Sequence, residues 1–445
     1  MPSGPLDAGH IALVAPRRVM SSAFDVDGLL VDSAGFAVAA IDARGADLGL
    51  ASPARSIDLE HLAAFCTTHV DVHGAPVPAW AELSGVYGTR DGRHVQIHCN
   101  FAHHAAGVVR RLGCSSSRVA VEASIAKRDA FELEAELIDD GMIGAAVRTL
   151  DEWDAHPHAA VTRDLPLVSI ERLGDADPIA ESATVPEHPL AGLRVLDCSR
   201  VLAGPTAGQM LAGFGADVLR IGAAHLPAVP VCVMATGFGK RNASLDLRTS
   251  DGAQRMDALL DDADVWIDAY RPGALAQLGF APERVAERRP GIVMVEVSAF
   301  DSVGPWAGRR GFDSIVQSTT GVRAAGGHHA VDDDGVPLDG GPVGLPVQAL
   351  DYATGFLAAG VAAHLVSHQR RFGGSWLARV SLLRTRNWLV GRREPHAFAP
   401  EQVMVDPRLL DDVDSDFGRL TTVRPFVGAT TDPPRALGTS EPAWV

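Results

Sequence analysis

The second half of the chain alternates short apolar runs with segments of helical character, and this alternation limits the folds open to it. Four apolar runs have the length of buried strands and occupy residues 193–199, 216–222, 264–270 and 291–300. Helical segments separate them, such as "SDGAQRMDALLDDA", which opens on a capping serine, and a further helix is expected over 271–280. Apolar strands separated by helices are typical of parallel sheets covered on both faces. The sequence therefore predicts a doubly wound α/β domain over 192–390.

The first 190 residues follow a different pattern. The stretch "GVYGTRDGRHVQIHC" (85–99) predicts a hairpin, because Asp91-Gly92 is a preferred turn pair. Helices at about 102–112 and 127–140 and a strand within 143–150 complete a smaller α+β domain over 76–171. Residues 172–191, rich in proline, alanine and acidic residues, predict a linker, and 391–445 a C-terminal tail. The Gly-, Pro- and Asp-rich segment 326–346 predicts a loop that is either a functional lid or simply exposed.

A faint internal repeat links the two ends of the chain. "VDSAGFAVAA" (31–40) resembles "LDYATGFLAAG" (350–360) with one residue deleted, and strand-like pieces follow at 54–62 and 378–386. We interpret residues 1–75 as a degenerate copy of the helix–strand unit at 345–386. Chance likeness between two alanine-rich helices is the alternative.

Charge and cysteine usage narrow the class of protein. A formal net charge of −16 argues against general binding to nucleic acid or to a membrane surface. The five cysteines are scattered and form no CxxC pair, which is typical of a reduced cytoplasmic protein and not of a disulfide framework or zinc site. They are Cys66, Cys99, Cys114, Cys198 and Cys232.

Two histidine groups raise the question of a metal site. Their members are His94, His98, His103 and His104 in one, and His156 and His158 in the other. No carboxylate or cysteine stands at ligand spacing beside them, so we expect surface or cleft-lining histidines and no metal.

The glycine-rich stretches do not match the common nucleotide motifs. "RVLAGPTAGQML" follows a strand and opens a helix but lacks the three glycines of GxGxxG, and Gly222 stands where the acidic residue of that motif is expected. "GFGKRNAS" contains Lys240, one of two lysines in the chain, but lacks the P-loop spacing. NAD binding and P-loop chemistry are therefore disfavoured.

One acidic residue opens an otherwise apolar helical run, "ALDYATGFLAAGVAAHL" (349–365). Asp351 can be interpreted as a cap or first-turn carboxylate stabilised by the helix dipole. The alternative is a buried, reactive carboxylate that a substrate can reach.

Five ordered blocks resemble family III CoA-transferases, the CaiB/BaiF group, which also contains acyl-CoA racemases. They are "PLAGLRVLDCSRVLAGPTAGQMLAGFGADVLRI", "GKRNASLDLRT", "ADVWIDAYRPGALAQLGF", "VMVEVSAFDSVGPWAGRRGFDSIVQSTTG" and "LDYATGFLAAG", and they cover about 190–385. Residues 85–160 resemble the small domain of that family, which in the family follows the large one. The chain therefore looks permuted, or like a fused and trimmed tandem copy. The resemblance implies a Rossmann-like large domain and a cytoplasmic, interlocked homodimer, with a monomer left open by the changed order.

The resemblance also implies a reaction: exchange of CoA between an acyl-CoA and a free carboxylic acid, with no tightly bound cofactor. Asp351 matches the aspartate of the DxxTG helix, which in the family is the nucleophile and carries CoA as an aspartyl thioester. Covalent catalysis of this kind divides the exchange into easier steps. Attack of the aspartate on the donor thioester first gives a mixed anhydride, and a buried apolar helix start keeps water from it.

Contacts to CoA are implied by family position or by charge. Val201, Leu202 and Ala203 match the nucleotide site, Arg310 a cationic contact, and Tyr270 and Ala274 a loop beside the adenine. On charge alone the candidates for CoA phosphates are Arg200, Arg220, Lys240, Arg241 and Arg271. Three positions depart from the family pattern by lacking a charge, namely Gly222, Ala223 and Gln277.

Two alternative functions stay open. An acyl-CoA racemase of the same fold needs a histidine where this chain has Phe312 in "GFDSIVQ", so its proton-transfer pair loses a member. A catalytically silent CoA-binding or interaction relative would explain the permuted order and the lost charges, but it leaves Asp351 unexplained.

Overall fold

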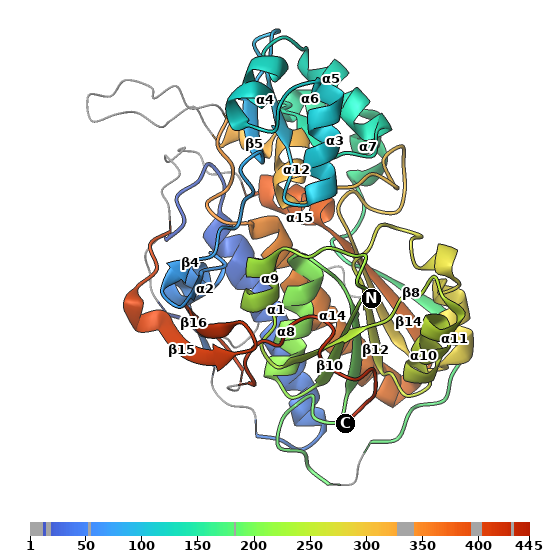
Figure 1. The fold of residues 1–445 in the computed structure, drawn as a ribbon. Coiled ribbons are helices and arrows are strands. Elements are labelled where there is room, and N and C mark those ends of the chain that lie inside the picture. The colour runs from blue at the N-terminus through green and yellow to red at the C-terminus, as the bar shows by residue number, and fades with distance from the viewer. Residues whose placement is uncertain are drawn as a thin grey trace.

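The computed structural model describes residues 12–14, 19–51, 55–181, 184–326, 342–392, 403–428 and 431–445 (Figure 1). A large α/β unit carries a smaller α+β unit on one end, and a third group of strands lies against its side. Most of the predicted loop 326–346 lies outside the described residues.

A seven-stranded sheet forms the centre of the large unit, in the order β11-β10-β9-β12-β13-β14-β8. All neighbours are parallel except β8, which pairs antiparallel with β14. The predicted parallel, doubly wound sheet is thus confirmed. The strands are β8 (Ser169–Gly174), β9 (Arg194–Cys198), β10 (Asp217–Gly222), β11 (Lys240–Ser244), β12 (Val265–Asp268), β13 (Val293–Ser298) and β14 (Ser375–Ser381).

Each face of this sheet has its own hydrophobic core, because successive strand residues point to opposite faces. Val195 joins the core that contains α8 (Ala203–Gly213) and α14 (Ala349–Phe372). Leu196 joins the second core, which contains α10 (Ser250–Leu260) and α11 (Pro282–Arg288). The strands are apolar throughout because both faces are covered.

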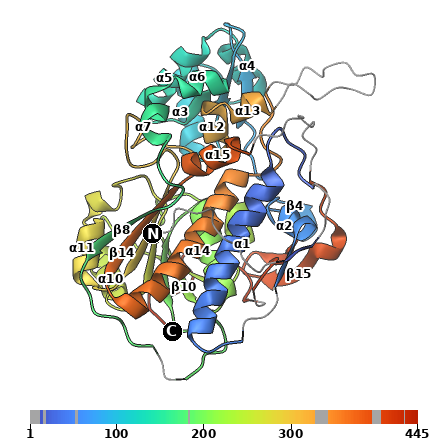
Figure 2. The same cartoon turned by 180° about the vertical axis from the view of Figure 1, so that it is seen from behind.

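Helix α14 is the central helix of the first core. It is long and apolar enough to cross a membrane by length and composition alone, but 94% of its most apolar window is buried inside the fold. Helix α1 (Val26–Asp47) lies beside it in both views (Figures 1 and 2). A Cβ on Gly360 would lie 2.9 Å from Cα of Ala37, so glycine permits this close approach. The two segments that resemble each other in sequence therefore pack together.

The small unit is built on a three-stranded antiparallel sheet. β5 (Gly85–Gly88) and β6 (His94–Ile97) form the predicted hairpin, whose turn contains Gly92 at φ 74°, and β7 (Gly144–Ala146) pairs with β6. Its helices are α3 (Ala102–Leu112), α4 (Arg118–Ile125), α5 (Ala130–Asp139), α6 (Leu150–Asp154) and α7 (Pro157–Thr162). The sequence predicted α3, but its helix at 127–140 is shorter in the structure, and α4 was missed.

A four-stranded sheet joins the two ends of the chain, in the order β15-β16-β3-β4. It contains β3 (Val70–Val72), β4 (Ala75–Pro76), β15 (Leu410–Ser415) and β16 (Gly418–Val423), so part of the predicted tail is a hairpin. Further along the tail, Ser440 N–H donates to the carbonyl of Asn242 at 2.9 Å and covers the β11 edge. A separate parallel pair consists of β1 (Ala12–Val14) and β2 (Ser56–Asp58).

Several local predictions need correction. Residues 271–280 form turns and a 3₁₀ helix, η1 (Ala276–Leu278), because Gly273 and Gly279 have positive φ and interrupt an α-helix. The predicted linker begins within β8, which is part of the large sheet.

The two strand-like pieces at 54–62 and 378–386 each turn into a helix halfway. The helices are α2 (Leu59–Phe65), capped by Asp58, and α15 (Leu382–Val390), capped by Ser381, whose Oγ accepts from Arg384 N–H at 3.1 Å. The remaining helices are α9 (Pro230–Ala235), α12 (Asp313–Thr319), α13 (Val322–Ala325) and η2 (Pro407–Leu409).

Candidate active site

The principal cavity lies at the carboxyl ends of β9 and β12. These strands are neighbours at the middle of the sheet, where the strand order reverses, which is where open α/β sheets bind ligands. Its volume is about 500 Å³. The segments that follow the two strands, 200–205 and 269–271, contribute to its wall.

Two units of the fold enclose this cavity. The small unit supplies His103 and His104 from the first turn of α3, together with Ile143. The segment that contains Arg310 and Phe312 completes that wall, and Arg310 Nη1 donates to the carbonyl of Gly141 at 2.6 Å. The site is therefore assembled between the large sheet and the small unit.

Residues predicted to match a nucleotide site follow β9 directly. Val201, Leu202 and Ala203 line the cavity, and α8 begins at Ala203. Gly204 allows the turn to approach the sheet, since a Cβ there would lie 2.5 Å from Cβ of Ser199 and 2.7 Å from Cβ of Ala269.

Tyr270 and Ala274 also line the cavity, and their place beside the adenine of CoA stays a prediction. The guanidinium of Arg200 lies 5.8 Å from the centre of the Tyr270 ring. Leu226, Leu245 and Leu278 give this side an apolar surface on which a flat ring can pack.

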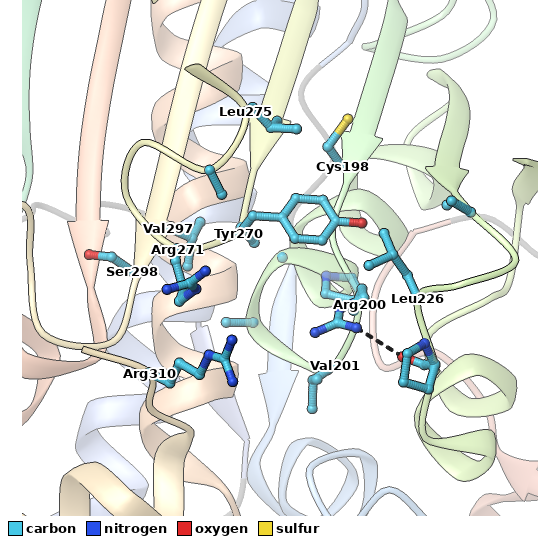
Figure 3. Close-up of a pocket in the computed structure, with 18 of the residues that line it drawn as sticks. Cys198, Arg200, Val201, Leu226, Tyr270, Arg271, Leu275, Val297, Ser298 and Arg310 are labelled. Carbon is cyan, nitrogen blue, oxygen red and sulfur yellow. Dashed lines mark hydrogen bonds between the residues drawn. The ribbon is translucent and has the colours of Figure 1, made fainter. Parts of the chain in front are cut away.

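Three arginines face the same opening from three different segments: Arg200, Arg271 and Arg310 (Figure 3). None of them has a carboxylate partner within the described residues. Among the residues that the structure describes, the carbonyl of Pro227 accepts from Arg200 Nη1 at 3.2 Å. Burial and the neighbouring arginines lower the pKa of Arg310. This is an electropositive pocket in a chain of strongly negative charge, and it suits an anionic ligand.

Asp351 lines the same cavity as the third residue of α14, and it is 7% exposed. It is not the cap of that helix, which is Gln348; it lies in the first turn. The backbone N–H of Ala203, at the start of α8, faces its carboxyl group and acts to lower the pKa of Asp351. Burial and the charge of Asp313 raise the pKa of Asp351 well above its usual range. The carboxyl group therefore meets two helix N-termini, which favour its anion.

Asp313 holds the start of α14 in place. Its Oδ2 accepts from the backbone N–H of Asp351 at 3.0 Å, and its Oδ1 accepts from the side chain of Gln317. Burial raises the pKa of Asp313 to about 6. The sequence analysis did not single out Asp313, although it stands beside Phe312 in a block that was noted.

Three predicted CoA contacts are not among the residues that line the cavity. Lys240 is fully buried, with Nζ 3.1 Å from Asp197 Oδ2 and 3.0 Å from the carbonyl of Pro205. Arg241 forms a bidentate pair with Asp217. Arg220 is buried, and a Cβ on Gly222, which lines the cavity, would be 2.9 Å from its Nη1. The positive charges of Lys240 and Arg241 are paired inside the fold, and a sequence pattern cannot distinguish them from charges that face a ligand.

The histidines divide between packing and the cavity. His98 is buried and stacks on Phe312 with ring centres 4.0 Å apart, whereas His103 and His104 line the cavity. His158 Nε2 lies 2.7 Å from the carbonyl of Phe300. Within the described residues, no three histidine, cysteine or acidic side chains are arranged to hold a metal ion.

Residues 190–409 match the family model of CoA-transferase family III. The chain is 27% identical to an acetyl-coenzyme A transferase of Hypoxylon pulicicidum over 332 residues, which is 70% of this chain and 54% of that protein. It is 32% identical to a probable fatty acyl-CoA transferase of Mycobacterium tuberculosis over 44% of this chain and 51% of that protein. A succinate–glutarate CoA-transferase of Agrobacterium fabrum is 30% identical over 46% of this chain and 56% of that protein.

Among solved structures, that of a hypothetical protein from Mycobacterium tuberculosis aligns with a TM-score of 0.40 at 30% identity, over 46% of this chain and 57% of that one. A CaiB/BaiF family protein from Brucella suis aligns with a TM-score of 0.38 at 23% identity, over 52% of this chain and 65% of that one. The chain spans about half the length of the curated relatives that it matches.

Proposed function

Because residues 190–409 form a CoA-transferase family III domain, we propose that the chain transfers CoA from an acyl-CoA to a free carboxylic acid, with Asp351 as the nucleophile. One observation carries this proposal: a buried carboxyl group and three arginines without carboxylate partners line one cavity. The arginines suit the phosphates of CoA, and the carboxyl group suits attack on its thioester.

The chemistry proceeds by two exchanges at Asp351. Its carboxylate attacks the thioester carbonyl of the donor, a C–O bond forms, and the C–S bond breaks to release CoA thiolate. The thiolate then attacks the Asp351 carbonyl of this mixed anhydride, which releases the donor acid and leaves an aspartyl-CoA thioester. The acceptor carboxylate then attacks the aspartyl-CoA thioester, which releases CoA thiolate and forms a second mixed anhydride. The thiolate attacks the acceptor carbonyl of this anhydride, releases the Asp351 carboxylate and leaves as the new acyl-CoA. Each intermediate is an activated acyl group, so the exchange needs no ATP.

The cavity supports these steps in specific ways. The Ala203 N–H faces the carboxyl group of Asp351 and favours the anion that attacks. Burial keeps water away from the anhydride. Tyr270 and the neighbouring leucines offer an apolar face for the adenine of CoA.

Trapping the intermediate tests the proposal. Incubation with acyl-CoA donors, chosen by screening against carboxylate acceptors, followed by hydroxylamine or borohydride, should place a modified side chain at Asp351 by peptide mass spectrometry. Asp351→Ala should abolish both the label and transfer while CoA still binds.

Asp32→Asn is the matched control, because Asp32 occupies the corresponding place in the sequence repeat. Its side chain is 43% exposed, pairs with Arg392 and does not line the cavity. A label on Asp32, or transfer by Asp351→Ala, would contradict the assignment. A protein that binds CoA but forms no adduct with any donor would instead be a silent relative.

A further inference from the structure

His104 is a polar side chain of the cavity wall that the proposed chemistry does not use. It is 3% exposed, and neither of its ring nitrogens has a hydrogen-bond partner within the described residues. A buried polar group without a partner is costly, so native structures rarely retain one without a reason. A ligand in the adjoining cavity can supply the missing partner.

The surroundings of His104 keep its imidazole neutral. Burial, with the positive charges of neighbouring histidines and arginines, lowers its pKa to about 3. A neutral imidazole offers one N–H donor and one acceptor nitrogen. It therefore suits a group that hydrogen-bonds, such as a hydroxyl or a carboxylate oxygen.

Besides Arg310, the other side chains of this wall are aromatic or apolar. The ring of His104 meets Phe101 edge-on at 5.5 Å, and Phe101 and His98 both pack against Phe312. Phe312 lines the cavity and directly precedes Asp313, which holds the amide of Asp351. The wall is thus linked to the proposed nucleophile through Phe312 and Asp313.

We infer that His104 is a specificity residue that hydrogen-bonds an oxygen on the acyl group, so that oxygen-bearing acyl groups are preferred to plain hydrocarbon ones. This inference rests on the proposed CoA transfer.

The test compares matched acyl-CoA donors with His104→Phe, His104→Asn and wild type. Butyryl-CoA, 3-hydroxybutyryl-CoA and succinyl-CoA differ mainly in the distal oxygen. Wild type should prefer the oxygen-bearing donors in kcat/KM, and His104→Phe should reduce that preference about 10- to 100-fold. His104→Asn, which keeps a donor and an acceptor, should retain part of it. His368→Phe is the control, since His368 packs on Phe372 and Trp376 outside the cavity.

Two further measurements separate other roles. The Kd for free CoA should be the same in wild type and His104→Phe. An equal loss of affinity for free CoA and for every donor would show that His104 contacts the CoA part of the donor, and it would overturn the inference. His104→Phe should unfold at the same temperature as wild type or higher, because it removes an unpaired polar group; a large drop would show a partner within the protein. If wild type transfers no CoA at all, the proposed function fails, whereas transfer with an unchanged preference in His104→Phe defeats only this inference.

Discussion

The backbone N–H of Asp351 donates a 3.0 Å hydrogen bond to Oδ2 of Asp313, so two buried carboxyl groups lie together at one end of α14. The contact fixes the start of the helix, and it also places a negative charge beside a group that must become an anion to react. Burial raises the pKa of both groups, to about 6 for Asp313. The residue that positions Asp351 therefore also raises its pKa.

The first prediction concerns pH. Asp351 attacks as the carboxylate, so kcat/KM should rise as pH increases through its raised pKa. Asp313→Asn removes the neighbouring negative charge and should move this rising limb to lower pH by about one unit. The pH–rate profile with one donor–acceptor pair measures the shift. Asp32→Asn should leave the limb in place, and a limb that moves to higher pH in Asp313→Asn would contradict the coupling.

The second prediction concerns the three cavity arginines. Replacing Arg200, Arg271 or Arg310 by methionine should raise the Kd for CoA about 5- to 30-fold, because each loses a charged contact to phosphate. Affinity for CoA should also fall as salt increases. Isothermal titration measures both effects. Arg241→Met is the control, since Arg241 is paired with Asp217 outside the cavity. If this variant weakened the binding of CoA as much as the others, the placement of the phosphates would be wrong.

The third prediction concerns the buried pair of Lys240 and Asp197. Lys240→Met leaves Asp197 as an unpaired buried charge and should lower the free energy of unfolding by about 3–5 kcal/mol. The double variant Lys240→Met/Asp197→Leu should recover part of that loss. Denaturant titration measures the stability, and CoA titration below the unfolding transition should give wild-type affinity. A stable Lys240→Met protein that no longer binds CoA would show instead that Lys240 contacts CoA.

The fourth prediction concerns the contact between α8 and α14. A Cβ on Gly355 would lie 2.5 Å from the carbonyl oxygen of Ala203. Gly355→Ala should therefore separate Asp351 from the Ala203 N–H, cost about 1–3 kcal/mol of stability and reduce transfer. Gly213→Ala, in the last turn of α8, is the matched control because no heavy atom lies within 4 Å of its added Cβ. Equal behaviour of the two variants in unfolding and transfer assays would refute this account.

The sequence predicted the parallel sheet because its strands are apolar on both faces, a pattern that burial alone determines. The family resemblance named Val201, Leu202, Ala203, Tyr270 and Arg310 as CoA contacts; these residues line one cavity, and their contact with CoA stays a prediction. The interrupted helix at 271–280 was missed because two glycines with positive φ outweigh the propensities of the residues between them.

What the sequence could not provide was the direction of individual side chains. Arg271 and Lys240 were equal candidates by charge, yet one lines the cavity and the other is paired with Asp197 inside the fold. His104 was noted only as part of a histidine group. Its place in the wall depends on how α3 meets the segments after β9 and β13, and no local pattern encodes such a contact.

The antiparallel strand β8 has a consequence for how the chain folds. Ser169 of β8 pairs with Arg379 of β14, about 200 residues further along the chain. During synthesis, β8 leaves the ribosome long before its partner exists, and its backbone groups stay unpaired until the last strand of the sheet arrives. Closing so long a loop is slow, because its entropy must be lost before the pairing compensates for it. Completion of this sheet edge is therefore expected to be a late, rate-limiting step, with an exposed strand open to misassembly in the interval.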